Sequence, residues 1–114
     1  MSGATGVPPT IRLLCTGNAA RSVMARAMFA DRAPDYRSVG AGTLVIEGLP
    51  MSSRTRNAMA GLGLADPDHR SSQFVTADVS ADLIVAMEPS HVAWIRRHHG
   101  EAAARTATLP RLVR

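Results

Sequence analysis

The sequence predicts a single α/β domain built on a parallel sheet, because apolar strand-like segments alternate with segments of helical periodicity along its 114 residues. The segment 83–87 is almost entirely apolar, as is typical of a parallel strand covered on both faces. The segment 11–15 is a second such strand, and a tight loop and a helical pattern follow it. A chain of this length suits one compact core. We expect a flexible tail over residues 1–10 and the α/β domain over residues 11–114.

Each predicted element has a local reason in the sequence. Gly17 and Asn18 tolerate left-handed backbone conformations, so a tight loop is expected between the first strand and the first helix. Ser52 or Ser53 can cap the second helix, and Pro89 suits the first turn of the last one. In chain order we expect strands at 11–15, 36–41, 83–87 and 104–109, and helices at 22–33, from about 53 to 62, at 76–81 and at 89–99.

Composition narrows the class of protein further. Apolar residues make up 46% of the chain and charged residues 19%, which is typical of a globular protein. The 13 basic residues are all Arg and are dispersed without interleaved aromatic residues, so we expect no nucleic-acid surface. No apolar run approaches the roughly 20 residues of a membrane helix. The single cysteine, Cys15, excludes an internal disulfide and a cysteine-based zinc site. We therefore expect a cytoplasmic protein with no metal, no cofactor and no membrane partner.

Residues 15–22, Cys-Thr-Gly-Asn-Ala-Ala-Arg-Ser, have the composition of an oxyanion site. Successive backbone N–H groups that lead into a helix N-terminus bind anions, and Arg21 lies where its guanidinium could close over a tetrahedral anion. The same positive field favours a thiolate at Cys15, and Ser22 can donate a hydrogen bond to the sulfur. A lone Cys at the end of a buried strand is more often an ordinary core residue. The combined pattern Cys-x5-Arg-Ser between strand and helix nevertheless predicts a nucleophile aimed at a bound phosphate.

Five segments of the chain, in this order and spacing, resemble the low-molecular-weight protein tyrosine phosphatase family. They are Cys15-Thr-Gly-Asn-Ala-Ala-Arg-Ser22, Gly40-Ala41-Gly42-Thr43, Gly48-x-Pro50-Met51, His69-Arg70-Ser71 and Ala81-Asp82-Leu83-Ile84-Val85-Ala86-Met87. The resemblance covers residues 11 to about 95. It implies a four-stranded parallel sheet and a cysteinyl-phosphate intermediate.

The resemblance also implies roles for individual residues. Cys15 would be the nucleophile, and Arg21 would be the second catalytic residue. The loop residues would bind phosphate: Thr16, Gly17, Asn18, Ala19, Ala20, Arg21 and Ser22. Asn18, Ser22 and His69 would support the shape of the loop.

One part of the family pattern has no match in this chain. The resemblance implies an Asp-Pro motif after the last strand, whose Asp would protonate the leaving group, and a closing helix. Here the only Asp-Pro pair, Asp66-Pro67, precedes His69 and does not match that position. We therefore expect that the chain lacks the C-terminal helix, and the general acid is unknown. The face left by that helix is expected to be covered either by further chain or by a second copy of the chain in a homodimer.

The leading hypothesis for function is phosphomonoester hydrolysis, as a protein tyrosine phosphatase, with a phosphorylated protein or a small phosphomonoester as substrate. Two alternatives stay open. The same thiolate could attack arsenate, and because no second cysteine is present, an external thiol would have to complete the reduction. The missing acid also allows a catalytically impaired oxyanion-binding protein, because general acid catalysis typically contributes about 10²–10⁴-fold to the rate.

Overall fold

The computed structural model of the chain describes residues 8–109. Four parallel strands form one sheet in the order β2-β1-β3-β4, which confirms the predicted fold class. The strands are β1 (Thr10–Cys15), β2 (Arg37–Gly42), β3 (Leu83–Ala86) and β4 (Thr106–Thr108). Because β1 and β3 occupy the centre, their side chains are covered on both faces, as their apolar sequences require.

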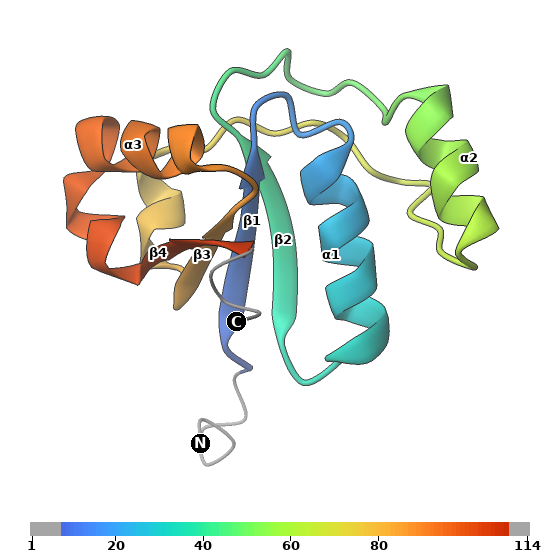
Figure 1. Cartoon of the computed structure of the whole chain (residues 1–114), viewed down its shortest axis with the longest axis horizontal. Coiled ribbons are helices and arrows are strands. Elements are labelled where there is room, and N and C mark those ends of the chain that lie inside the picture. Colours follow the sequence, from blue (N-terminus) through green and yellow to red (C-terminus); the bar gives the residue numbers. More distant parts are fainter. Residues whose placement is uncertain (1–7, 110–114) are drawn as a thin grey trace.

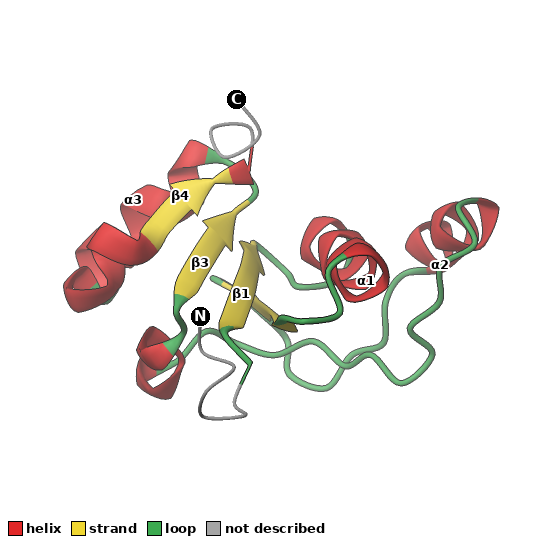
Figure 2. Cartoon of the chain, turned by 90° about the horizontal axis from the view of Figure 1, so that it is seen from below, coloured by secondary structure: helices red, strands yellow, loops and turns green. Residues whose placement is uncertain are grey.

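The helices divide between the two faces of the sheet (Figures 1 and 2). The elements are α1 (Arg21–Arg32), α2 (Ser53–Gly61), α3 (Pro89–His98) and the 3₁₀-helices η2 (Thr76–Ser80) and η3 (Gly100–Arg105). Figure 1 shows α1 on one side of the sheet and α3 on the other, with α2 beyond α1. Ser52 is the N-cap of α2, where its hydroxyl accepts the Thr55 N–H at 3.2 Å.

Alternation along β1 builds the core on both faces. Ile11 and Leu13 pack with Val85 and with the half-buried Phe29 on the α1 side. Leu14 points to the opposite face, into a cluster with side chains from β3, α3 and η3. A third cluster joins α1 to α2 through Val23, Ala27, Met51 and Met59. The period of two along the strand thus accounts for both apolar layers.

Most predicted boundaries differ from the structure by one residue, and two of the differences, at the first and the last strand, affect the fold. The first strand begins at Thr10, which pairs with Arg37, and not after a tail that ends at residue 10. The last strand is only Thr106–Thr108, because residues 104 and 105 belong to η3. Alanine favours helix over strand, and the alanine-rich run 102–104 therefore extends the 3₁₀-helix. Residues 1–7 of the predicted tail, and any closing helix after residue 109, lie outside the described residues.

The topology determines where the site lies. Parallel strands end at the same edge of the sheet, and ligands bind beyond that edge. Cys15 ends β1, and Glu88, the N-cap of α3, follows the neighbouring strand β3 by two residues. The loop 15–22 and the start of α3 are therefore neighbours, although about 70 residues separate them in the sequence.

Candidate active site

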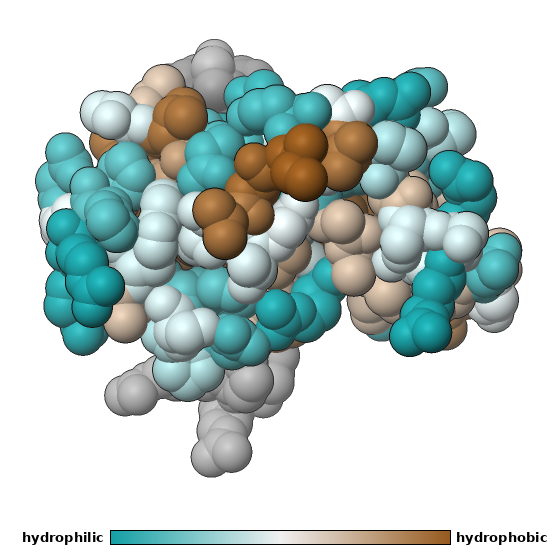
Figure 3. Space-filling model, turned by 90° about the horizontal axis from the view of Figure 1, so that it is seen from above, coloured by the Kyte–Doolittle hydropathy of each residue, from teal (hydrophilic) through white to brown (hydrophobic). Residues whose placement is uncertain are grey.

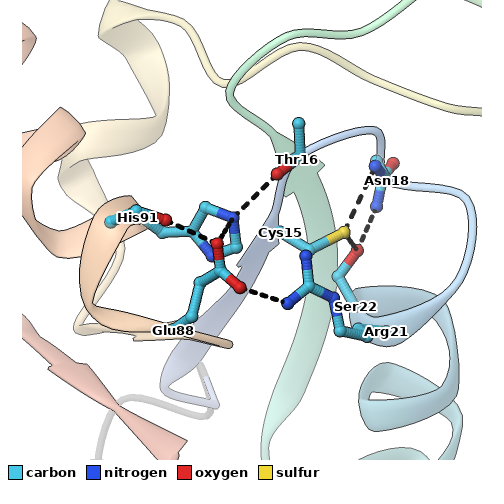
Figure 4. Close-up of polar contacts among 8 residues, drawn as sticks. Cys15, Thr16, Asn18, Arg21, Ser22, Glu88 and His91 are labelled. Atoms are coloured by element: carbon cyan, nitrogen blue, oxygen red, sulfur yellow. Dashed lines mark hydrogen bonds and ion pairs between the residues drawn. The ribbon is translucent and has the colours of Figure 1, made fainter.

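The sulfur of Cys15 lies at the floor of the loop that joins β1 to α1 (Figure 4). Cys15 is 3% exposed, while Thr16 and Arg21, near the two ends of the loop, are exposed. The chain bends at every residue from 16 to 20 before α1 begins. The loop thus wraps around the sulfur and places it just ahead of a helix N-terminus.

The amide groups of the loop are available to a ligand. Within residues 8–109, no hydrogen bond engages the backbone N–H groups of Gly17, Ala19, Ala20, Arg21 or Ser22. The N-cap of α1, Ala20, also has no side-chain oxygen that could occupy them. Open donors in one loop at the positive end of a helix dipole form an anion site.

Two donors meet at the sulfur. The Asn18 N–H donates to Cys15 Sγ at 3.3 Å, and Ser22 Oγ lies 2.9 Å from the same sulfur. Asn18 Nδ2 donates to Ser22 Oγ at 2.8 Å, which leaves the Ser22 hydroxyl hydrogen for the sulfur. The sulfur thus accepts from both donors.

Hydrogen bonds to Asn18 hold the loop in its conformation. Its φ of 52° lies in the left-handed region, which Asn tolerates better than most residues. Its carbonyl accepts from His69 Nε2 at 2.7 Å and from Ser71 Oγ at 3.0 Å. Its side-chain Oδ1 accepts the Ser72 N–H at 3.0 Å. Since a carbonyl only accepts, His69 carries a proton on Nε2. The predicted supporting residues Asn18, Ser22 and His69 are thus linked by hydrogen bonds.

The end of β2 supports the first two loop residues. The Thr43 N–H donates to the Cys15 carbonyl, and the Leu44 N–H donates to the Thr16 carbonyl, both at 3.0 Å. A Cβ at Gly42 would lie 2.5 Å from the Thr16 carbonyl oxygen. Only glycine permits this close approach of the two backbones. The Gly-Ala-Gly-Thr segment therefore has a steric function in the loop.

The structure adds two residues that the sequence analysis missed. Arg21 Nη1 donates to Glu88 Oε2 at 2.7 Å, and Thr16 Oγ1 lies 3.0 Å from His91 Nε2 (Figure 4). Glu88 also accepts from Ser90 Oγ at 2.6 Å. The signal that could have found Glu88 and His91 was their place just after the strand 83–87, because that strand and the cysteine strand end at one sheet edge.

The environment sets the charge of these two residues. The hydrogen bonds from Ser90 and from Arg21 lower the pKa of the Glu88 carboxyl. Burial lowers the pKa of the His91 imidazole, against the Glu88 charge and together with the Arg21 charge. At neutral pH, Glu88 is therefore ionised and His91 is neutral.

The other candidate residues are placed as follows. Gly17 and Ala19 are half-buried and Ala20 is exposed. None of the three has a polar side-chain atom, so only their backbone N–H groups can bind an anion. Asp66, of the Asp-Pro pair, is bound to Arg26 of α1 at 3.0 Å. No group of three His, Cys, Asp or Glu side chains among residues 8–109 could hold a metal ion. None of the helices in that range is long and apolar enough to cross a membrane.

A buried sulfur that accepts two hydrogen bonds, below open amides and beside an arginine, is the arrangement expected of a cysteine-dependent phosphatase. Comparison with known proteins agrees with this class. The family model "Low molecular weight phosphotyrosine protein phosphatase" matches residues 10–113. The chain therefore belongs to the low molecular weight protein-tyrosine-phosphatase family, and it is a cysteine-dependent phosphatase.

Individual relatives support the same assignment. The probable low molecular weight protein-tyrosine-phosphatase EpsP of Ralstonia nicotianae is 33% identical over 104 residues, which are 90% of this chain and 70% of EpsP. The structure of the YwlE arginine phosphatase from Geobacillus stearothermophilus matches with a TM-score of 0.87 and 31% identity, over 93% of this chain and 70% of YwlE. The low molecular weight protein tyrosine phosphatase from T. tengcongensis matches with a TM-score of 0.87 and 30% identity, over 92% and 76%. The chain spans 63 to 64% of other curated relatives.

Proposed function

We propose that the protein hydrolyses phosphotyrosine in proteins, with Cys15 as nucleophile and with Arg21 and the loop amides as the phosphate-binding groups. The observation that carries the proposal is the pair of donors, Asn18 N–H and Ser22 O–H, on a buried sulfur beneath open amides. Such donors orient the sulfur for attack, and the open amides suit the oxygens of a phosphoryl group.

The proposed reaction has two steps. The Cys15 thiolate attacks phosphorus, an S–P bond forms, and the P–O bond to the leaving alcohol breaks as that oxygen takes a proton. Water then attacks phosphorus, the S–P bond breaks, and inorganic phosphate and the thiolate are released. Arg21 and the amides would stabilise the equatorial oxygens in both steps.

Glu88 is not the proposed source of the leaving-group proton. Its hydrogen bonds with Ser90 and Arg21 keep its pKa low, so it carries no proton at neutral pH. A general acid needs a proton to give at the working pH. Glu88 instead holds Arg21, and another group protonates the leaving oxygen.

The proposed substrate class draws on the surface around the site. Figure 3 shows an apolar patch over the loop between β2 and α2, where Leu44 (78%), Ile46 (73%) and Leu49 (46%) are the exposed large apolar residues. The backbone of Leu44 is hydrogen-bonded to Thr16 at the site. Aliphatic side chains there suit an aromatic ring better than a charged side chain. EpsP, by its name a tyrosine phosphatase, supports the same substrate.

The Cys15→Ser variant tests the chemistry. Turnover of p-nitrophenyl phosphate should disappear, while the affinity for inorganic phosphate should stay within about threefold, because the binding groups are unchanged. Ala104→Ser, at an exposed position of η3, is the matched control and should behave as wild type. Turnover that survives in Cys15→Ser would exclude Cys15 as the nucleophile.

Substrate choice needs a separate measurement. Phosphotyrosine and phosphoarginine peptides of the same sequence should be compared by kcat/KM, since YwlE is an arginine phosphatase by its title. We expect phosphotyrosine to be preferred. Arsenate-dependent oxidation of an added thiol would instead support the arsenate-reductase alternative, which the relatives do not favour. Phosphate binding without any turnover would support the non-catalytic alternative.

We also propose a cytoplasmic location and a homodimer. A single reduced thiol, needed for catalysis, suits a reducing compartment. Leu83, Met87 and Leu109 are only partly buried beside the core cluster on the α1 face, and a second copy could cover them. Sedimentation at several concentrations tests the dimer, and a mass of one chain throughout would exclude it.

A further inference from the structure

The first turn of α3 contacts both ends of the loop 15–22. Glu88 binds Arg21 near the end of the loop, and His91 contacts Thr16 at its beginning. Glu88 and His91 are three residues apart, so they share one face of the helix start. His91 Nε2 lies 3.7 Å from Glu88 Oε1, which links the two contacts (Figure 4). A chain of four side chains therefore runs from Thr16 to Arg21 across the mouth of the site.

The buried member of this chain is His91, which is 2% exposed. Its Nδ1 is buried and has no hydrogen-bond partner among the described residues. An unpaired buried N–H is rarer than an unpaired buried acceptor, which favours the tautomer with its proton on Nε2. His91 then donates to Thr16 Oγ1. Because burying a partly unsatisfied polar ring is unfavourable, a core position alone does not explain a histidine here.

The exposed member is Arg21, whose side chain is 50% exposed and is held through one nitrogen of its guanidinium group. Nη1 binds Glu88, and no hydrogen bond within residues 8–109 engages Nε or Nη2. An arginine held at one nitrogen keeps the rest of its planar fork for a bidentate contact with an oxyanion. The Glu88 contact also limits the rotamers of a long side chain before any ligand binds.

We propose that Glu88 and His91 are positioning residues of the phosphatase site: Glu88 orients Arg21 for the phosphoryl oxygens, and His91 fixes Thr16 and braces Glu88. The inference rests on the proposed role of Arg21 in phosphate binding. Neither residue touches the phosphoryl group. Both act through a loop residue, so their loss should weaken phosphate binding without removing the nucleophile.

Glu88→Gln tests the first half. It keeps the shape of the side chain and removes its charge, so Arg21 should become less ordered. We expect the KM for p-nitrophenyl phosphate and the inhibition constant of inorganic phosphate to rise about tenfold together. The melting temperature should stay within about 2 °C, because an exposed ion pair contributes little to stability. Asp66→Asn, which removes the charge from the Arg26–Asp66 pair, is the matched control and should keep both constants.

A double-variant cycle tests whether Glu88 acts through Arg21. In an Arg21→Lys background, where the fork is absent, adding Glu88→Gln should change KM and the phosphate inhibition constant by less than about twofold. Equal effects of Glu88→Gln in both backgrounds would show that Glu88 acts by another route, and would overturn the proposed link.

His91→Gln and His91→Asn test the second half as a pair. Gln can place an N–H where Nε2 stands and donate to Thr16, whereas the shorter Asn cannot reach it. We expect His91→Gln to keep KM within about threefold of wild type and His91→Asn to raise it about tenfold. If both variants have the melting temperature and the KM of wild type, His91 does not position Thr16 and Glu88.

The outcomes separate this inference from the proposed function. If wild type neither hydrolyses p-nitrophenyl phosphate nor binds inorganic phosphate, the proposed function fails and the inference fails with it. If wild type does both while Glu88→Gln and His91→Asn keep its KM and phosphate affinity, only the inference fails.

Discussion

The amide of Asn18 packs directly on the backbone of Gly40, so that a Cβ at position 40 would lie 2.7 Å from Asn18 Nδ2. Real Cβ atoms do not approach a nitrogen this closely. Asn18 cannot move away without losing its hydrogen bonds to Ser22 and Ser72. Strand β2 therefore sets the position of the loop through a residue that has no side chain.

Gly40→Ala should consequently disturb the site more than the fold. The added methyl group displaces Asn18, and overpacking of this kind typically costs about 1–3 kcal/mol. We expect a lower free energy of unfolding by that amount and a loss of kcat/KM of at least about tenfold. Urea unfolding and p-nitrophenyl phosphate hydrolysis measure the two effects.

Gly61→Ala is the control for this prediction. Gly61 is the last residue of α2, and a Cβ there would meet no heavy atom within 4 Å. Alanine in a helix is more favourable than glycine, so stability should stay equal or rise slightly. A Gly40→Ala variant as stable and active as Gly61→Ala would contradict the steric role of Gly40.

The left-handed backbone of Asn18 predicts a difference between two substitutions. Asn18→Gly and Asn18→Ala both lose the side-chain hydrogen bonds, so both should lose most phosphatase activity. Only alanine must also adopt a φ of 52°, which costs about 1–2 kcal/mol for a residue with a Cβ. Asn18→Ala should therefore be the less stable variant in urea unfolding. Equal stabilities would mean that the loop changes its backbone conformation when the side chain is lost.

The Ser22 hydroxyl predicts the reactivity of the sulfur. Ser22→Ala removes one of the two donors to Cys15 and should lower kcat/KM by about 10–100-fold. The rate of alkylation of Cys15 by iodoacetamide should change as well, because the hydroxyl that contacts the sulfur is lost. Ser80→Ala, on the surface of η2, is the matched control. Unchanged alkylation in Ser22→Ala would show that the hydroxyl does not act on the sulfur.

The sequence alone predicted the sheet and most of the loop for a physical reason. Apolar strands such as β3 and a helix start after Cys15 are patterns of consecutive residues, so they can be recognised in the sequence without the fold. The start of the short strand β4 was harder to predict, since the alanine-rich run 102–104 belongs to the preceding 3₁₀-helix η3. The predicted types of the helices and strands therefore agreed with the structure better than their predicted ends did.

The contacts across the sheet edge could not be predicted in the same way. Glu88 and His91 carry no motif of their own, and only the pairing of β1 with β3 brings them to Arg21 and Thr16. The steric need for glycine at position 40 could not be predicted either, because its neighbour Asn18 lies on another element. Sequence periodicity shows which face is buried, but register decides which side chains meet.

The last prediction concerns acid stability and His91. Burial lowers the pKa of His91, against the nearby Glu88 charge and together with the Arg21 charge, below the value of about 6.5 expected for an unfolded chain. Between the two pKa values the unfolded chain binds more protons than the folded protein, so the free energy of unfolding falls as the pH falls through that window. Above about pH 6.5 both states hold a neutral imidazole, and this contribution is constant.

His91→Gln removes this titration while it keeps a donor for Thr16. In urea unfolding between pH 7.5 and pH 5, wild type should therefore lose more stability than His91→Gln, because all other titrating groups are common to both. The difference between the two free energies should be flat above about pH 6.5 and change only below it. Parallel curves over the whole range would show that a proton on His91 costs the folded protein nothing, and that the imidazole is not held neutral by its buried position.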